Sequence, residues 1–168
     1  FCHNLNATFI AYSCYNLRIM TMNNQHTISE KTLIKGIGLH SGQKVRMWLH
    51  PAKANSGIEF IRSDVEQFDN IVPAIYSNVT ETNLGTTIAN DDGTMVATIE
   101  HLMSALWGAS IDNVVVEIDA PEVPILDGSS REFLQAIEAA GATALDTAKE
   151  SIEILKKIEV EDAGKHLS

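Results

Sequence analysis

The feature that most constrains the fold is a short strand pattern placed between two helical patterns. Residues Asn113–Asp119, NVVVEID, are rich in β-branched side chains, and we expect this strand to lie in the centre of a sheet. The segments 98–108 and 129–140 on either side carry apolar residues at helical spacing. Together with several strand patterns upstream, this order predicts an α+β domain, a mixed β-sheet with two helices packed on one face.

The upstream patterns predict the remaining strands of that sheet. Residues 28–37 are expected to form one strand, and Val45–Leu49 alternate apolar and polar side chains as a half-buried strand does. The glycines of Gly36–Gly42 place a hairpin turn between these two strands. Further strand candidates are residues 57–62 and 86–89, the latter followed by a hairpin turn at Asn90–Gly93.

The first helical segment carries a carboxylate beside an imidazole. We expect Thr98 to be its N-cap, accepting a hydrogen bond from the backbone N–H of Glu100 or His101. A helix N-terminus favours an ionised carboxylate, as a general base requires, and disfavours an imidazolium, which cannot bind a metal. Taken alone, an adjacent Glu-His pair is more often part of a solvated helix face, so the surrounding motifs have to decide.

The second helical segment is expected to open at Ser129 with a capping box, in which Ser129 and Glu132 satisfy each other's backbone N–H groups. Gly141 follows where a C-terminal glycine belongs. In this interpretation Asp127 and Ser129 are turn and cap residues rather than catalytic ones. The apolar stripe of this helix consists of Phe133, Leu134, Ile137 and Ala140.

The sequence divides into three parts. Residues 1–21 show no clear period and are interpreted as a non-native or disordered leader, with Met20 and Met22 as natural start candidates; a mobile native extension is the alternative. Residues 22–146 form the expected α+β domain. Residues 147–168 are interpreted as a linker and the start of a truncated second domain.

Two segments follow the second helical segment. Ala142–Thr147 is linker-like, and Ile152–Val160 is expected to begin a new strand.

Composition excludes several classes of function. The chain has 12 basic and 22 acidic residues, a net charge of −10, which argues against a nucleic-acid partner. It contains no apolar run long enough to cross a membrane. Both cysteines, Cys2 and Cys14, lie near the start, so we expect no disulfide framework and no cysteine-based zinc site. A reducing, cytoplasmic location fits this cysteine usage.

Four motifs occur in order along the chain: Gly36–Gly42 (GIGLHSG), Thr98–Leu102 (TIEHL), Ile111–Val114 (IDNV) and Pro121–Ser129 (PEVPILDGS). Together they closely resemble the N-terminal half of the UDP-3-O-acyl-N-acetylglucosamine deacetylase family, the zinc enzymes of bacterial lipid A synthesis. The resemblance runs from about Thr27 to the last residues. Each motif alone is a weak signal, whereas four in order with comparable spacing are specific.

The resemblance implies a fold, a reaction and a set of site residues. Family members have two similar α+β domains, with zinc in the cleft between their helices, and they remove the N-acetyl group from UDP-3-O-acyl-N-acetylglucosamine. By motif match, His101 is the zinc ligand of the first domain and Glu100 the general base. More loosely, Leu84 and Gly85 border the substrate. His40 either lines the site or is a turn histidine bonded to the backbone.

The resemblance also implies what the sequence lacks. The second zinc histidine, the zinc aspartate and the acid histidine of the family belong to its C-terminal domain. We therefore expect an N-terminal fragment that binds Zn²⁺ weakly, is inactive alone and is completed by that domain in cis. One alternative is a non-catalytic domain that binds a nucleotide-sugar or a protein, and another is a half that meets a separate C-terminal chain. The Glu100-His101 pair favours the enzyme, because a binding module has no chemical need for it.

Overall fold

The computed structural model describes residues 24–66, 69–150, 155, 157, 159–162 and 165–167. In chain order the elements are β1 (Asn24–Ile28), β2 (Thr32–Ile37), β3 (Lys44–Pro51), β4 (Ile58–Arg62), β5 (Ile71–Pro73), the 3-10 helix η1 (Tyr76–Asn78), β6 (Val79–Glu81), β7 (Thr87–Ala89), β8 (Met95–Val96), α1 (Glu100–Gly108), β9 (Val114–Ile118), α2 (Arg131–Ala140), β10 (Ala142–Ala148), β11 (Val160–Asp162) and β12 (Lys165–Leu167). Within these ranges, no helix has the length and apolar character needed to cross a membrane.

A mixed sheet of five strands in the order β2-β3-β9-β4-β5 is the centre of the domain. Strand β9 runs parallel to β4, and the other neighbouring pairs are antiparallel. The predicted central position of the β-branched strand is therefore confirmed. On one face of β9, Val114, Val116 and Ile118 are completely buried, because period-two alternation points these side chains to the same side.

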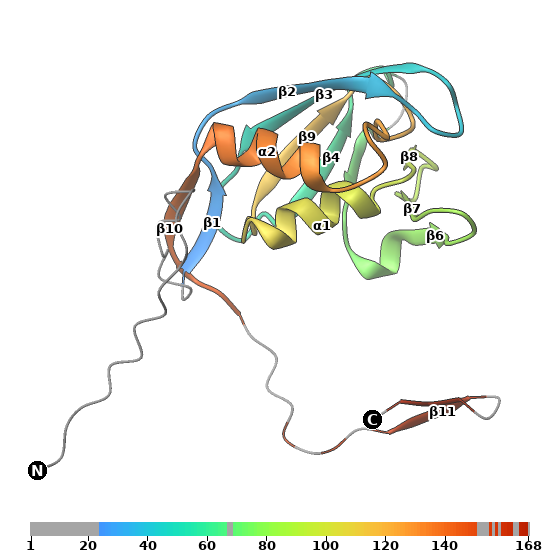
Figure 1. Ribbon diagram of the computed structural model, residues 1–168, viewed down its shortest axis with the longest axis vertical. Helices are drawn as coiled ribbons and strands as arrows, with labels where there is room; N and C mark the ends of the chain where they lie inside the picture. The colour runs from blue at the N-terminus through green and yellow to red at the C-terminus, as the bar shows by residue number, and fades with distance from the viewer. Residues whose placement is uncertain are drawn as a thin grey trace, which may run out of the picture.

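Both helices lie on the same face of this sheet and pack against each other (Figure 1). Leu102 and Leu106 of α1 and Phe133 and Ile137 of α2 are at most 1% exposed, and they meet the inward side chains of the sheet in one core. The α+β architecture is confirmed, as are the apolar stripes that the helical spacing predicted.

Two smaller sheets extend the domain. The sheet β6-β7-β8 includes the hairpin predicted at Asn90–Gly93, where the Asn90 side chain accepts a hydrogen bond from the Thr94 N–H at 2.9 Å. The predicted hairpin around Gly36–Gly42 is also present, as the antiparallel pair β2-β3. A third, two-stranded sheet pairs β1 with β10, which lie side by side in Figure 1.

Two predictions about strands were wrong in part. Residues 32–37 are a strand, β2, but Ile28 is the last residue of β1 in a different sheet, and Ser29–Lys31 separate the two strands. The linker-like segment Ala142–Thr147 is most of β10, which pairs antiparallel with β1. The pairing joins segments more than 110 residues apart, and the Ala- and Thr-rich β10 carries no apolar alternation that would reveal it.

The start of α2 also differs from the prediction. The helix begins at Arg131 with Ser130 as the N-cap residue, and no side chain caps it. The Ser129 hydroxyl instead donates to the Asp127 carboxylate at 2.8 Å and accepts from the Arg131 N–H at 3.1 Å, so it belongs to the preceding turn. The C-terminal Gly141 is as predicted, with a φ of 71°.

Beyond Glu150 only a few residues are described. The predicted strand Ile152–Val160 lies largely outside the described residues; of those that are described, Val160 belongs to a strand, β11, which pairs with β12. The predicted leader, residues 1–21, lies outside them altogether.

Candidate active site

The Glu100 carboxylate is fixed at the first turn of α1 by the loop that precedes β7. Its Oε2 atom accepts a hydrogen bond from the Thr86 N–H at 2.9 Å. The Thr86 carbonyl in turn accepts one from the Ile99 N–H at 3.3 Å. This reciprocal pair ties the loop to the start of the helix and holds the half-buried carboxylate in one orientation.

Gly85 lies beside the same carboxylate. A Cβ atom at this position would be 3.4 Å from Glu100 Oε1 and 3.6 Å from Thr98 Oγ1. The structure therefore brings Gly85 and Glu100 together. Leu84 is different, since its φ is 61° and its side chain is 89% exposed to solvent.

Thr98 is not the N-cap that the sequence predicted. The N-cap residue is Ile99 and no side chain caps the helix, so Glu100 and His101 are its first two residues. Thr98 has a φ of 57°, in the left-handed region, and is 3% exposed. Its hydroxyl donates to Glu122 Oε1 at 3.2 Å, and its left-handed backbone is not the extended conformation of a capping residue.

Glu122 is the partner that sequence reasoning missed. It is 2% exposed, and its carboxylate also accepts the backbone N–H groups of His40 at 2.9 Å and Ser41 at 2.8 Å. Burial raises the pKa of this carboxyl, but the hydrogen bonds from Ser41, His40 and Thr98 outweigh it and hold the pKa below its usual value. A buried, ionised carboxylate thus joins the 38–42 turn to Thr98, two residues before α1.

Glycine makes this arrangement possible. A Cβ atom on Gly38 would lie 2.4 Å from Glu122 Oε2, and one on Gly36 would lie 2.7 Å from Pro124 Cβ. Gly38 also forms an isolated β-bridge with Pro124. The spacing of the two glycines, which the sequence offered only as a turn, was the signal that another segment packs closely on this strand.

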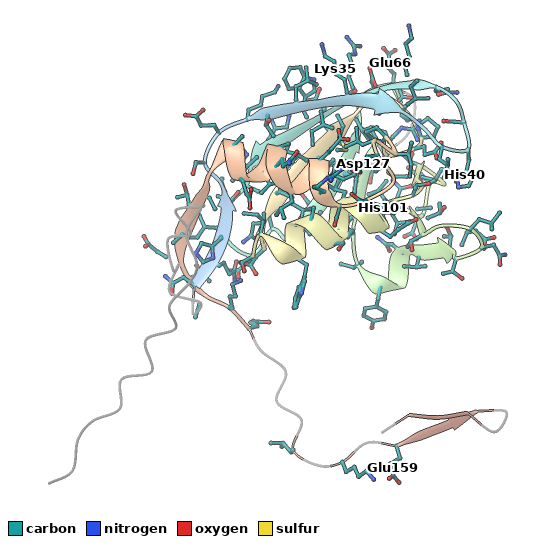
Figure 2. The ribbon with its side chains drawn as sticks, viewed as in Figure 1. Lys35, His40, Glu66, His101, Asp127 and Glu159 are labelled. Atoms are coloured by element: carbon teal, nitrogen blue, oxygen red, sulfur yellow. The ribbon has the colours of Figure 1, made fainter. Side chains whose placement is uncertain are left out.

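His40 lies in the loop after β2, and Figure 2 shows it with His101 among the labelled side chains. Its side chain is exposed, and its backbone N–H is the group that bonds to Glu122. The structure thus connects His40 to the start of α1 through Glu122 and Thr98, without a described contact between its ring and Glu100. A role for the imidazole in the site remains a prediction.

The comparison with known proteins decides the family. The model of the LpxC family, UDP-3-O-acyl N-acetylglycosamine deacetylase, matches residues 25–168. The chain belongs to the LpxC family. The resemblance inferred from the four sequence motifs is confirmed.

Individual relatives of the LpxC family give the same result. The chain is 45% identical over 141 residues to the UDP-3-O-acyl-N-acetylglucosamine deacetylase of Shewanella pealeana and 44% identical over 141 residues to that of Aliivibrio fischeri. The protein of the same name from Vibrio atlanticus is 45% identical over 141 residues. In each case the match covers 84% of this chain and 46% of the relative, so the chain spans about half the length of the curated relatives it matches.

The LpxC motif Ile111–Val114 has a structural role in this chain. The Asp112 carboxylate accepts the His26 N–H at 2.8 Å and pairs with Lys149 at 2.9 Å. Asn113, 1% exposed, accepts the Gly57 N–H at 3.0 Å. These bonds hold β1 and the turn before β4 against the residues that follow α1.

The donor set of the described residues fits part of a zinc site. The half-buried His101 follows Glu100 in the first turn of α1, and no described side chain is hydrogen-bonded to its imidazole. Across the described ranges, no cluster of three or more His, Cys, Asp or Glu side chains is arranged to hold a metal. Because a catalytic zinc takes three protein ligands and keeps an open position, this part of the chain can supply one of them.

Proposed function

We propose that the protein containing this chain hydrolyses the N-acetyl group of UDP-3-O-acyl-N-acetylglucosamine, a zinc-dependent step of lipid A biosynthesis in the cytoplasm. The observation that carries this proposal is the first turn of α1. There Glu100 is fixed by the Thr86 N–H and is followed directly by His101, whose imidazole has no described hydrogen-bond partner. Membership of the LpxC family supplies the reaction class.

Glu100 is proposed as the general base. The Thr86 N–H occupies its Oε2 atom, while Oε1 faces Gly85, where no side chain intervenes. Oε1 is then the atom that takes a proton from the attacking water. Neighbouring residues on a helix point in different directions. The Glu100 carboxylate and the His101 imidazole can therefore act on different atoms, the first on the water and the second on the metal.

His101 is proposed as one zinc ligand. When bound, zinc would lower the pKa of its water to about 7 and polarise the amide carbonyl. The remaining ligands and the acid that protonates the leaving amine are proposed to come from the C-terminal domain that the family resemblance implies. By itself, the 168-residue chain is then expected to bind Zn²⁺ weakly and to be inactive.

Two substitutions in the full-length, zinc-loaded protein test these roles. Glu100→Ala is expected to lower kcat by about 10²- to 10⁴-fold, the usual contribution of a general base, with zinc content unchanged. His101→Ala is expected to lose zinc, measured by atomic absorption after dialysis. Ser104→Ala and Glu138→Ala, exposed positions on α1 and α2, are the matched controls. Unchanged turnover in Glu100→Ala rules out the base role, and full zinc occupancy in His101→Ala rules out the ligand role.

A non-catalytic domain is the second candidate, and one observation favours it. Trp107 on α1 is 87% exposed, as an aromatic side chain in a partner-binding surface would be. This candidate predicts no substrate turnover by the full-length protein and no effect of Glu100→Ala on partner binding. Substrate turnover by the wild-type full-length protein therefore separates the two functions.

A further inference from the structure

We propose that Glu122 is a positioning residue, which couples the 38–42 turn to the start of α1 and thereby sets the orientation of Glu100 and His101. This inference rests on the proposed deacetylase function for its kinetic consequence, and on the structure alone for its effect on the helix start. Neither the sequence pattern nor the family resemblance gave Glu122 a role.

The contacts of Glu122 span two segments distant in sequence. Oε1 receives the His40 N–H and the Thr98 hydroxyl, and Oε2 receives the Ser41 N–H. Each partner is a donor, so the ionised form of the carboxylate satisfies all three. An apolar side chain at this buried position would leave all three donors without an acceptor, and a neutral amide would leave at least one of them without an acceptor.

Thr98 is the residue through which Glu122 acts on the helix. A β-branched residue at a φ of 57° is strained, and the surrounding contacts must hold it there. Backbone bonds fix its neighbour, because the Ala97 N–H donates to Pro121 at 2.8 Å and the Ala97 carbonyl accepts from Val123 at 3.0 Å. The bond to Glu122 is the one described hydrogen bond of the Thr98 side chain.

The Thr98 hydroxyl has a competing use. Threonine is a good N-cap, and the sequence predicts that Thr98 caps this helix from the extended region of φ and ψ. The bond to Glu122 holds Thr98 in its left-handed conformation, in which it does not cap the helix, and the helix then starts at Glu100. If Thr98 returned to the capping conformation, the first turn would shift by a residue and Glu100 would leave the Thr86 N–H.

The main test is Glu122→Gln in the full-length, zinc-loaded protein. Glutamine has the same shape, but its NH₂ group would face a donor from His40, Ser41 or Thr98. We expect kcat to fall about 10- to 100-fold with KM little changed, as for outer residues that orient a metal site. In hydrogen-exchange mass spectrometry, peptides covering residues 38–42 and 97–103 should exchange faster than in the wild type.

Thr98→Val and Asp112→Asn complete the design. Thr98→Val keeps the β-branched shape and removes only the hydroxyl, so kcat should fall about 5-fold with the same exchange signature in residues 97–103. Glu122→Gln/Thr98→Val should be no slower than Glu122→Gln, since the Thr98 hydroxyl acts through its bond to Glu122.

Asp112→Asn is the control for general destabilisation. It weakens a comparable carboxylate bond to a backbone N–H beyond the other end of α1, and it should lower Tm while leaving kcat unchanged.

The outcomes separate the two proposals. Wild-type kcat and wild-type exchange in Glu122→Gln overturn the positioning role, and so does an equal loss of kcat in Asp112→Asn, which would reflect general destabilisation. If Glu122→Gln does not fold, the same criteria apply to Thr98→Val. If the wild-type protein does not hydrolyse the substrate but the exchange changes as expected, the deacetylase proposal fails and the structural coupling stands.

Discussion

Arg62 illustrates at the residue scale how one buried charge joins two parts of the domain. Arg62 is 7% exposed at the end of β4 and donates to the Met95 carbonyl of β8 at 2.6 Å. Its Nε and Nη2 atoms both bond to Asp64 at 2.8 Å. Hydrogen bonds from Arg62 lower the pKa of Asp64 against the smaller, opposing effect of burial. The carboxylate therefore keeps a buried guanidinium paired.

We predict that Asp64→Asn lowers the stability of the full-length protein by up to about 1 kcal/mol at pH 7, because it removes the negative charge that pairs with Arg62 from a side chain that is itself 36% exposed. The folded pKa of Asp64 lies below the unfolded value. Its contribution is therefore complete above the unfolded pKa, near 4, and is lost as the pH falls through the folded pKa. Urea unfolding from pH 7 to pH 3 should show the wild type and Asp64→Asn converging in acid.

Asp146→Asn is the control for this prediction, since Asp146 is exposed on β10. It should leave the urea midpoint unchanged at every pH. Equal midpoints for Asp64→Asn and the wild type at pH 7 would contradict the role given to the Arg62–Asp64 pair.

Residue-scale prediction from sequence succeeded where the partner was local or generic. The apolar stripes of both helices were predicted because the spacing of apolar residues identifies the buried face of a helix, whichever element covers it. The predicted positions of Glu100 and His101 in the first turn were nearly correct, because the N-cap is Ile99 instead of Thr98 and the helix therefore starts one residue later than predicted. The capping role of Thr98 failed because its partner, Glu122, lies 24 residues away and no periodicity connects the two.

At the scale of the element, β9 and β10 show which kinds of strand can be predicted from a sequence and which cannot. Strand β9 has neighbours on both sides, so its β-branched run is buried and recognisable. Strand β10 is largely exposed and, among the described strands, pairs with β1 alone, which makes its composition resemble a linker. Its contribution is to cover β1, where Gln25, His26, Thr27 and Ile28 are at most 8% exposed.

Thr143→Pro should disrupt the β1–β10 pair. Thr143 lies opposite the buried Thr27, and proline removes the backbone N–H at this position. We expect a loss of about 1–3 kcal/mol in the full-length protein, measured by thermal unfolding, together with faster amide exchange in residues 24–28.

Thr143→Val is the matched control, because it keeps the N–H and the β-branched shape and removes only the exposed bond to Ser29. Its stability should stay within about 0.5 kcal/mol of the wild type. If Thr143→Pro were as stable as Thr143→Val, the pairing would contribute nothing measurable.

For the whole molecule, three of the four motifs that identified the LpxC family come together from separate stretches of chain, whereas the fourth serves another part of the domain. Gly36–Gly42, Thr98–Leu102 and Pro121–Ser129 meet around Glu122, next to the proposed base and zinc ligand. Ile111–Val114 instead secures β1 and the turn before β4. The order of these motifs was enough to identify the family. Their separate structural roles could be recognised only from the three-dimensional contacts.

The last prediction concerns the whole protein and follows from the single zinc ligand proposed for this chain. A metal held by one imidazole instead of three protein ligands should dissociate readily. We therefore expect the 168-residue chain to lose zinc on gel filtration and to show no deacetylation, whereas the full-length protein keeps one zinc ion. Adding the rest of the protein as a separate polypeptide should restore both properties in part, and the same mixture made with His101→Ala should restore neither. Tight binding of one zinc ion or turnover by the chain alone would show instead that the ligands needed lie within it.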